Sequence, residues 1–550
     1  MKDLLLEHIS KSIISNWNIP ALADFHGKSY TYGQLAEKIA RLHLLYKELG
    51  VKPGDKVALC AKNSADWAAM FLSGLTYGAV VVPLLYEFTP GNIAHLVAHS
   101  GAKLLFSEKS IADNLDVEKM PDVRAILLLG DIQVYHSSVA DAQKLVAKAD
   151  ADFDAAYPKG FGKEDVRYHS ADSSDVALIN YTSGSMGNSK GVMLTYGNLW
   201  SNIHFALTRI DFLHHGDGML SMLPLAHMYG LAFELLFPFC RGCHITFLGR
   251  VPSPKIVLEA FGEVRPQLVI TVPLVIEKIV KTRVFPVVHK PLMRVLTAIP
   301  GIRSIIYGKI KKQLLGAFGG QLHQLILGGA PLTEDVENFL RRIKFPFTIG
   351  YGMTECAPLL TYEYWTTQRP HSCGRLVDGM QARIDSPDPE HVPGVLFVKG
   401  PNVMKGYYRN DEATAEVLSP DGWLNTGDMC TMDKDGYLYI RGRQKSMILG
   451  ASGQNIYPEE IETVINELPL VGESVVVDRG GRIVALIHPD YEHARKDLHL
   501  TEEQADKRVK ALLPEMNKKL PGYSRVSEIE IMHDEFEKTP KHSIRRFIYK

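Results

Sequence analysis

Short apolar runs alternate with amphipathic helical stretches through most of this chain, and this alternation restricts the possible folds more than any other feature. Clear apolar runs are residues 57–60, 80–84, 176–179, 268–272 and 325–327. Several of them are followed by glycine, serine or proline and then by a helix-like pattern. That order is typical of βα units arranged around parallel sheets. The sequence therefore predicts an α/β fold.

The pattern changes in the last part of the chain, which predicts a division into domains. From residue 394 onward, short strand-like runs with turn residues follow one another, as in GVLFVKG and DGYLYIRG. After residue 443 the chain is more charged and shows helical patterns. A chain of 550 residues is long enough for more than one domain. We expect a large N-terminal domain over residues 1–442 and a small C-terminal domain over residues 443–550.

Composition excludes several classes of protein. Lysine and arginine together number 61 against 62 acidic residues, so we expect no nucleic-acid partner. The 6 cysteines are sparse for this length and indicate a reducing compartment. Cys240 and Cys243 form a lone CxxC pair, which predicts two ordinary thiols rather than a zinc site. The sequence has no signal-peptide pattern and no run of about 18 uncharged apolar residues, so we expect a cytoplasmic protein.

A loop rich in hydrogen-bond donors follows the apolar run at 176–179. Its sequence over residues 180–191 is NYTSGSMGNSKG, which from Thr182 onward holds four hydroxyl side chains, three glycines and Lys190. Glycines let backbone N–H groups turn toward an anion, hydroxyls add donors, and lysine adds positive charge. The loop does not fit GxxxxGK(S/T), because Ser189 stands where that pattern needs glycine. It predicts a phosphate-binding loop, with a flexible surface loop as the alternative.

This loop resembles the signature loop of the adenylate-forming superfamily, which comprises acyl-CoA synthetases, firefly-luciferase-like enzymes and peptide-synthetase adenylation domains. The usual form is YTSG(S/T)TGxPKG; here Met186 replaces the second threonine and Ser189 replaces proline. Met186 removes one hydroxyl donor and so one expected phosphate contact. The resemblance implies that ATP phosphates are held by Thr182, Ser183, Gly184, Ser185, Gly187 and Lys190.

Three further segments match this superfamily in its order along the chain. LPLAHMYG at 223–230 is similar to a segment whose histidine, here His227, lies at the mouth of the acyl pocket. LGGAPL at 327–332 resembles the strand end that lies along adenine, with Gly329 and Ala330. GYGMTE at 350–355 matches the YGxTE motif. In that motif the resemblance implies adenine stacking by Tyr351 beside Gly352, an α-phosphate contact by Thr354 and a magnesium ligand in Glu355.

The remaining motifs lie near the expected domain boundary. DGWLNTGD at 421–428 resembles the segment whose aspartate, here Asp428, accepts hydrogen bonds from the ribose hydroxyls. GRQK at 442–445 resembles the hinge, which implies a ribose contact by Arg443 and a pivot at Lys445. GQNIYPEEIE, which begins at Gly453, is similar to the loop that helps to shape the pantetheine tunnel. Each of these motifs taken alone is more often a plain turn or a solvated charged loop.

Seven motifs in the expected order imply both a fold and a reaction. The implied fold has a large domain with two doubly wound α/β subdomains and a small β-barrel, followed by a small mobile α+β domain. The implied reaction is ATP-dependent activation of a carboxylic acid to acyl-AMP with pyrophosphate release, then transfer to coenzyme A. Mg²⁺, Lys190 and the loop N–H groups would offset repulsion between the carboxylate and the phosphates. The implied catalytic residues here are Lys190, His227, Thr354 and Glu355.

The chain departs from the superfamily near its end. The usual segment TPxxKIxR carries an adenylation lysine, whereas residues 539–546 read TPKHSIRR and place Ser543 at that position. Lys541 lies two residues earlier, and residues two apart in an extended segment point to the same face with Cα atoms roughly 6–7 Å apart. We hypothesise that Lys541 takes the catalytic role. The alternative is a solvated basic tail.

The acid itself is less strongly indicated. Residues 272–279 resemble long-chain acyl-CoA synthetases, and no acidic residue is placed to hold an amino group, so we expect a medium- or long-chain fatty acid. The alternatives are an aryl acid, a carrier-protein thiol in place of CoA, and a non-catalytic nucleotide-binding homologue.

A basic amphipathic stretch precedes the adenine segment. Residues 278–320 hold nine lysines or arginines interleaved with apolar residues and no acid. This pattern predicts either peripheral contact with an anionic membrane or a solvated helix face. The sequence leaves the oligomeric state open, a homodimer included.

Overall fold

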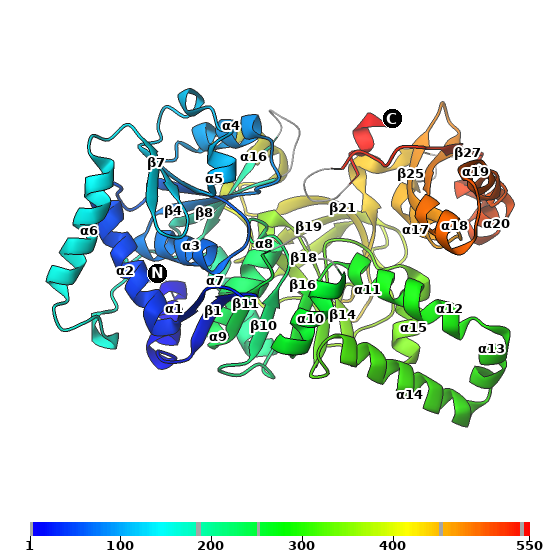
Figure 1. Ribbon diagram of the computed structural model, residues 1–550. Helices are drawn as coiled ribbons and strands as arrows, with labels where there is room; N and C mark the ends of the chain where they lie inside the picture. The colour runs from blue at the N-terminus through cyan, green and yellow to red at the C-terminus, as the bar shows by residue number, and fades with distance from the viewer. Residues whose placement is uncertain (1–3, 183–188, 250–253, 450–454, 539–543, 550) are drawn as a thin grey trace.

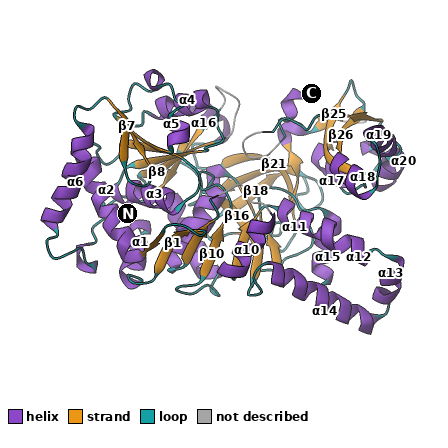
Figure 2. Ribbon diagram, in the orientation of Figure 1, coloured by secondary structure: helices purple, strands orange, loops and turns teal. Residues whose placement is uncertain are grey.

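The computed structural model describes residues 4–182, 189–249, 254–449, 455–538 and 544–549. A large N-terminal part is built on several sheets, and a smaller C-terminal part lies beside it at one end (Figure 1). Strands occupy the interior and helices lie around them (Figure 2). The predicted mixed α/β fold, with a large N-terminal and a smaller C-terminal part, is confirmed.

An eight-stranded sheet lies at the N-terminal end of the molecule. Its strand order is β20-β9-β8-β4-β3-β5-β6-β7, with parallel pairing from β8 to β6 and antiparallel pairing at both edges. In that order the strands are β20 (Gly406–Tyr407), β9 (Gly191–Thr195), β8 (Val176–Tyr181), β4 (Val80–Leu84), β3 (Lys56–Cys60), β5 (Leu104–Ser107), β6 (Ala125–Leu128) and β7 (Gln133–Ser137).

Helices cover both faces of this sheet, which explains why its central strands are apolar throughout. On β3, Val57 and Leu59 belong to one buried core and Ala58 and Cys60 to another. Both sets of alternating side chains are therefore buried, as in parallel sheets with two covered faces. Three covering helices, each with a Ser or Thr side chain that caps its N-terminus, are α2 (Tyr32–Glu48), α3 (Ala65–Tyr77) and α4 (Pro90–Ser100).

Two smaller sheets with parallel strands follow. One has the order β10-β11-β1-β2 and the other the order β12-β13-β14. Their strands are β1 (Pro20–Asp24), β2 (Ser29–Thr31), β10 (Gly218–Ser221), β11 (His244–Phe247), β12 (Leu268–Thr271), β13 (Gln324–Leu327) and β14 (Phe347–Ile349). Helices that pack near them are α1 (Leu5–Ser15), α7 (Tyr196–Arg209), α9 (Phe237–Arg241), α10 (Pro254–Val264), α11 (Pro273–Ile279) and α15 (Glu334–Arg342).

Antiparallel sheets occupy the region where the sequence resemblance implies a small barrel. One has the order β15-β16-β17 and the other β18-β19-β21-β22. Closure of these strands into a barrel stays a prediction. The strands are β15 (Tyr351–Gly352), β16 (Leu359–Tyr362), β17 (Arg375–Leu376), β18 (Gln381–Asp385), β19 (Gly394–Lys399), β21 (Leu424–Met432) and β22 (Leu438–Arg443).

The C-terminal part has cores of its own, separate from those of the larger part. The predicted boundary between residues 442 and 443 falls at the end of β22 and stays a prediction. The main elements are β25 (Val471–Asp478), β26 (Ile483–Pro489), β27 (Glu528–Ile531), α17 (Pro458–Asn466), α18 (Tyr491–Asp497), α19 (Glu502–Lys510) and α20 (Leu513–Lys519).

Two general properties of the described residues bear on function. None of their helices combines the length and the apolar character needed to cross a bilayer. All six cysteines are free thiols.

Candidate active site

One large cavity collects most of the residues that the motifs single out. Its volume is about 1510 Å³, and it is walled by the phosphate loop's ends, the segment around His227, the ends of β12 and β13, and the segment from β15 to Glu355. Residues from the start of the C-terminal part also reach it. The predicted site residues that line this cavity are Thr182, Lys190, His227, Gly329, Tyr351, Gly352, Thr354, Glu355, Arg443 and Lys445.

The phosphate loop joins two neighbouring antiparallel strands. It connects β8 to β9 and is closed at its base by hydrogen bonds between one pair of residues, Thr182 and Lys190. Thr182 N donates to Lys190 O at 3.0 Å, and Lys190 N donates to Thr182 Oγ1 at 3.2 Å. The strands thus hold both stems at the cavity wall. The remaining predicted residues of the loop lie outside the described residues: Ser183, Gly184, Ser185 and Gly187.

Lys190 and Glu355 are linked through a residue that the sequence did not single out, Tyr407. Strand β20 pairs with β9, which places Tyr407 opposite Val192 and brings it beside the loop. Lys190 Nζ lies 4.8 Å from the centre of the Tyr407 ring. The Tyr407 hydroxyl donates to Glu355 Oε1 at 2.9 Å. Burial and then the Glu355 charge raise the pKa of Tyr407, so its hydroxyl keeps the proton that it donates.

A buried carboxylate lies behind the opposite wall of the cavity. Asp428 is 2% exposed and sits opposite Arg443 in the register of β21 and β22. Arg443 Nε lies 2.8 Å from Asp428 Oδ1, and the Tyr351 hydroxyl donates to Asp428 Oδ2. Burial raises the pKa of Asp428, while Arg443 and Tyr351 oppose that rise. The three predicted nucleotide contacts are therefore brought together as one charged, hydrogen-bonded group.

Two glycines in the motifs stand at positions that another residue could not occupy without a clash or backbone strain. A Cβ on Gly352 would lie 2.1 Å from Pro358 O, so only glycine fits between this strand and its neighbour. Gly329 has a φ of +83°, a conformation that glycine adopts without strain. Ala330 follows it outside the cavity wall. A Cβ on Gly329 would meet nothing closer than Val272 Cγ1 at 3.9 Å, so a flat ring can approach the backbone at this position.

The segment 221–225, which leads to His227, is held by a network around Glu234, a residue in the π-helical segment Leu231–Leu236. Glu234 Oε2 accepts hydrogen bonds from Ser221 Oγ at 3.0 Å, Met222 N at 3.0 Å and Leu223 N at 2.9 Å. Asn63 supports the same segment, since its Nδ2 donates to Leu223 O at 2.7 Å and its Oδ1 accepts from Leu225 N at 3.0 Å. Glu234 is fully buried, and burial raises its pKa to about 8.

Comparison with known proteins assigns the chain to a family. The model of the AMP-binding enzyme family matches residues 15–408, and the model of the AMP-binding enzyme C-terminal domain matches residues 445–549. This chain belongs to the AMP-binding enzyme family. It is an enzyme of the AMP-forming acid–CoA ligase type within the adenylate-forming superfamily.

Relatives of this AMP-binding enzyme differ in the acid that their names state. A feruloyl-CoA synthase from Amycolatopsis is 32% identical over 82% of this chain and 81% of the relative. A long-chain-fatty-acid–CoA ligase from Escherichia coli is 30% identical over 97% of this chain and 92% of the relative. The structure of ATP-bound MatB from Rhodopseudomonas palustris has the same fold, with a TM-score of 0.78 and 23% identity over 100% of this chain and 98% of that chain.

The cavity of this AMP-binding enzyme extends beyond the motif residues into an apolar arm. We use this name for the stretch of wall to which α10 contributes Val257 and Phe261, and α11 contributes Val275 and Ile279, together with Ala317. Of these positions, only Val275 and Ile279 fall in a segment that the sequence singled out, residues 272–279. The apolar character and helical spacing of these wall residues alone could not separate them from ordinary core residues, because both patterns are the same in sequence.

Besides the four loop residues, two more predicted site residues of this AMP-binding enzyme lie outside the described residues, Gly453 and Lys541. Ser543, which replaces the usual lysine, lies outside them too. The residue that follows this tail is anchored: Arg546 Nη1 donates to Glu462 Oε1 at 2.6 Å. This contact ties the described residues after 543 to helix α17.

The donors around Glu355 are of the kind that Mg²⁺ uses. Magnesium takes oxygen ligands and is usually bound by one or two carboxylates together with substrate phosphates. Glu355 lies at the cavity wall with Thr354, within the same cavity as Lys190. These residues therefore fit a magnesium ion that accompanies phosphates.

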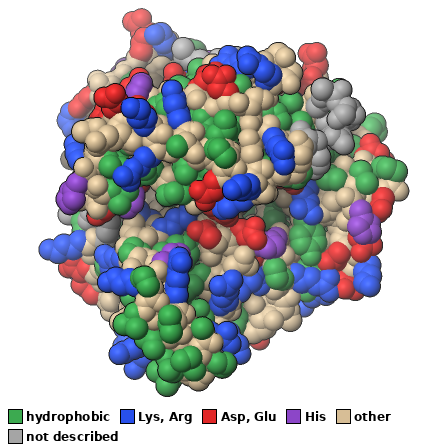
Figure 3. Space-filling view, turned by 90° about the vertical axis from the view of Figure 1, so that its right-hand side faces the viewer, with side chains coloured by type: hydrophobic (Ala, Val, Ile, Leu, Met, Phe, Trp, Pro, Cys, Tyr) green, Lys and Arg blue, Asp and Glu red, His purple; other side chains and the backbone are tan. Residues whose placement is uncertain are grey.

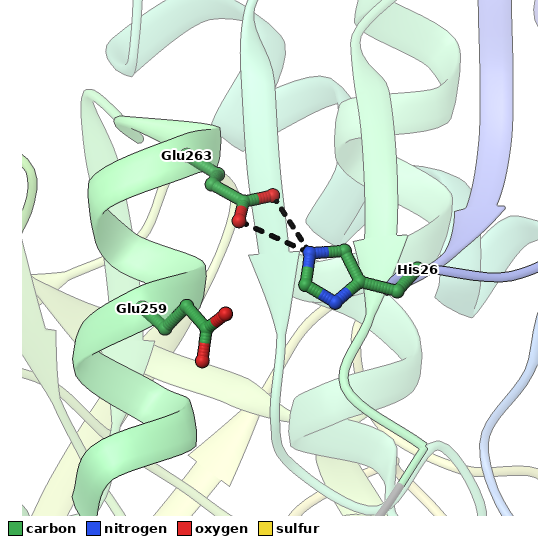
Figure 4. A group of neighbouring side chains, drawn as sticks. All are labelled: His26, Glu259 and Glu263. Atoms are coloured by element: carbon green, nitrogen blue, oxygen red, sulfur yellow. Dashed lines mark hydrogen bonds and ion pairs between the residues drawn. The ribbon is translucent and has the colours of Figure 1, made fainter.

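A second group of acidic and histidine side chains lies away from the cavity. His26, Glu259 and Glu263 have ligand-type atoms within 4.8 Å of one another, and all three are exposed (Figure 4). His26 Nε2 already contacts both carboxylate oxygens of Glu263, at 3.0 and 3.1 Å. This is a surface ion pair with a neighbouring carboxylate, and we assign no metal to it.

Proposed function

We propose that this enzyme activates a medium- or long-chain fatty acid to acyl-AMP and then transfers the acyl group to coenzyme A. The observation that carries the proposal is the apolar arm of the cavity. It is walled by Val257, Phe261, Val275 and Ile279 and opens from the same cavity as Lys190 and Glu355. An alkyl chain in this arm would place its carboxylate toward the phosphate-loop side.

In the first half-reaction, a carboxylate oxygen attacks the α-phosphorus of ATP and pyrophosphate leaves. Mg²⁺ would supply charge neutralisation for the phosphates, with Glu355 as its protein ligand. Lys190 and the phosphate-loop N–H groups stabilise the departing pyrophosphate, and Thr354 contacts the α-phosphate. Tyr351, Gly329 and Ala330 would lie against adenine, and Asp428 with Arg443 would hold the ribose.

In the second half-reaction, the CoA thiolate attacks the acyl carbon and AMP leaves as the anhydride bond breaks. We propose that the part after residue 442 rotates about Lys445 between the two steps, so that a different nucleophile reaches the same place. His227 would border the acyl carbon in both steps. Lys541 would enter the site for the first step alone.

The tail lysine is tested by one substitution. Lys541→Ala should lower acyl-AMP formation and leave the reaction of preformed acyl-AMP with CoA unchanged. A variant with Lys538→Ala, which removes a neighbouring lysine paired with Glu473, is the matched control. Unchanged acyl-AMP formation in Lys541→Ala would show that the lysine role is filled by another group.

The finer features of the fold belong to the same proposal. We place the domain boundary between residues 442 and 443, two doubly wound subdomains before residue 350, and a barrel formed by the antiparallel strands after it. The three sheets with parallel strands and the antiparallel sheets of β15 to β22 support this arrangement.

An aryl acid is the second candidate, and one observation favours it. A feruloyl-CoA synthase is among the relatives, at 32% identity. The long-chain fatty-acid relative aligns over a greater share of this chain, which favours the fatty acid. The identity of the acid depends on the residues that wall the apolar arm.

The test is pyrophosphate release with ATP and Mg²⁺ for acids from acetate to oleate, and for ferulate, with and without CoA. We expect release that requires a medium or long alkyl chain and turns over fully only with CoA. A preference for ferulate would indicate that the substrate is an aryl acid and not a fatty acid. Release without CoA turnover would indicate a carrier-protein thiol, and no release with any acid would indicate a non-catalytic homologue.

A further inference from the structure

Three helices form an arm that projects from the large domain beside the C-terminal part (Figure 1). We call residues 285–317 the helical arm; it comprises α12 (Phe285–Val288), α13 (Pro291–Ala298) and α14 (Pro300–Ala317). Helix α13 buries none of its residues, and α14 buries only Leu314. A helix as short as α13 gains little stability in water without packing. Residues at the base of the arm, such as Val288 and Leu314, pack on the core, whereas α13 at its tip contributes nothing to the core.

The exposed side of α13 is apolar. Leu292, Val295 and Ile299 are 69%, 64% and 47% exposed. Their spacing of three and four residues places them on one face of the helix. Val287 and Ile305 extend this exposed apolar surface onto the neighbouring helices. In a soluble helix a stripe of this kind faces the core, so its outward position indicates contact with something outside the chain.

The charge around this apolar face has a single sign. Nine lysines and arginines lie between residues 278 and 320, and no acidic residue occurs between 278 and 333. Within the described parts of the chain, none of the nine forms an ion pair. Lys290, Arg294 and Arg303 are exposed next to the apolar stripe. In Figure 3 hydrophobic side chains gather at the lower end of the molecule with lysines and arginines around them.

We propose that the helical arm seats this enzyme on the surface of a bilayer that contains anionic lipids. The stripe of Leu292, Val295 and Ile299 would enter the headgroup region, and the surrounding lysines and arginines would contact lipid phosphates and carboxylates. Long basic side chains can lay their apolar stems along such a surface while their charges stay in water. A projecting, convex, uniformly positive tip fits a membrane plane better than it fits the concave surface of one protein partner.

The same surface leads to the cavity. Helix α11 and the π-helical turn Val280–Val284 run directly into α12, and Leu274, Lys278, Thr282 and Arg283 line the cavity while lying exposed. Leu274 is 69% exposed, so the apolar arm of the cavity reaches the surface beside the helical arm. If the substrate is a fatty acid, as proposed above, it would pass from the bilayer into the cavity without crossing bulk water.

The test is flotation of the full-length protein with vesicles of phosphatidylcholine alone and of phosphatidylcholine with phosphatidylserine. We expect flotation only with the anionic vesicles, and weaker flotation when salt is raised from about 0.1 M to about 0.5 M. The variant K290E/R294E/R303E should partition at least about tenfold less, because three positive charges are reversed at the anionic surface. L292S/V295S/I299S should also lose binding, through the apolar contact.

The matched control is K159E/K163E/R167E, which makes the same charge change at exposed positions far from the helical arm. It should float as the unaltered protein does. Unchanged thermal unfolding of the arm variants would show that their loss is not a folding defect, and this is expected because the substituted side chains are exposed.

Absence of flotation of the unaltered protein would overturn the proposal and leave a protein partner as the occupant of the arm. Equal flotation of the arm variants, or of the unaltered protein on neutral vesicles, would overturn it as well. The result is separable from the proposed function, because flotation needs no turnover. Octanoate activation in solution without lipid reports the chemistry alone and should be unaffected in both arm variants.

Discussion

The nucleotide side of the cavity and the helical arm are built on opposite principles. On the nucleotide side, three charged groups have partners inside the protein: Asp428 pairs with Arg443, and Glu355 accepts from Tyr407. On the helical arm six lysines and arginines form no ion pair with any described residue, and apolar side chains face outward. Paired and buried groups hold a fixed geometry for chemistry, whereas unpaired exposed groups are available to a partner outside the chain. Substitutions on the two sides should therefore differ in what they change.

The largest effect is expected from Glu355→Gln, which removes the charge proposed to hold Mg²⁺. Pyrophosphate release at saturating ATP should fall by about 100-fold or more, the usual loss when an electrostatic contact to developing charge is removed. Glu416→Gln is the matched control, because Glu416 also lines the cavity but is assigned no contact with phosphate. Equal losses of pyrophosphate release in both variants would contradict the assignment of Glu355 as the magnesium ligand.

A smaller effect is expected from Tyr407→Phe. This change keeps the ring beside Lys190 and deletes the hydroxyl that donates to Glu355 at 2.9 Å. A hydrogen bond to a charged group contributes about 1.5–3 kcal/mol, so kcat/KM for ATP should fall by about tenfold or somewhat more. Tyr408→Phe, at the next position, should leave kcat/KM near its original value. An unchanged kcat/KM in Tyr407→Phe would mean that Glu355 keeps its position without the Tyr407 hydroxyl.

Glu234→Leu should act on stability more than on chemistry. Glu234 Oε2 accepts three hydrogen bonds inside the protein, and leucine would leave the Ser221 hydroxyl and two backbone N–H groups without that acceptor. The free energy of unfolding should drop by about 1–3 kcal/mol, with a modest rise in KM for the acid because the segment with His227 loosens. Thermal unfolding and steady-state kinetics measure the two effects. Unchanged stability would contradict the network described here.

The same residue predicts a pH dependence with a definite sign. Burial raises the pKa of folded Glu234 to about 8, from 4.5 for an unperturbed glutamate. Between these values the folded state holds a proton that the unfolded state has lost. The stability that this bound proton contributes is fully present below the pKa of the unfolded state, and it is lost as the pH rises through about 8. Glu234→Gln should lack this downward slope. Unfolding curves compared between mildly acidic and mildly alkaline buffer test it.

The smallest effect on chemistry in solution is expected from the helical arm. L292S/V295S replaces two side chains that are 69% and 64% exposed, so turnover of octanoate without lipid should stay within about twofold of the unaltered protein. Lipid-dependent turnover of oleate should fall. Loss of octanoate turnover would show that the arm supports the site directly, which would end the contrast between the two regions.

The sequence predicted much of the nucleotide side because its residues occur in short contiguous motifs. Lys190, Tyr351, Glu355 and Arg443 were placed on one site from the sequence alone, and all four line one cavity. Contiguous motifs carry their geometry locally, since a strand end or a tight turn fixes each of them. The contacts of the loop residues between 183 and 188 stay predictions.

Residues that join distant segments were not predicted. Tyr407 acts across the pairing of β20 with β9, and Asn63 reaches a segment more than a hundred residues away. Neither has a local signature, because its role depends on which strands become neighbours. Apolar runs predicted the buried strands well, with boundaries off by one residue at Val272, which begins the cap of α11 rather than ending β12. Strand ends are decided by such local caps.

The central claim is that one cavity holds both an alkyl acid and the reacting phosphates. A single-turnover reaction with ATP and Mg²⁺ and an equimolar mixture of octanoate, oleate and ferulate, read by mass spectrometry, tests it most directly. We predict that a fatty acyl-AMP accumulates without CoA and converts to the matching acyl-CoA when CoA is added. Accumulation of feruloyl-AMP in preference, or of no acyl-AMP at all, would contradict the account.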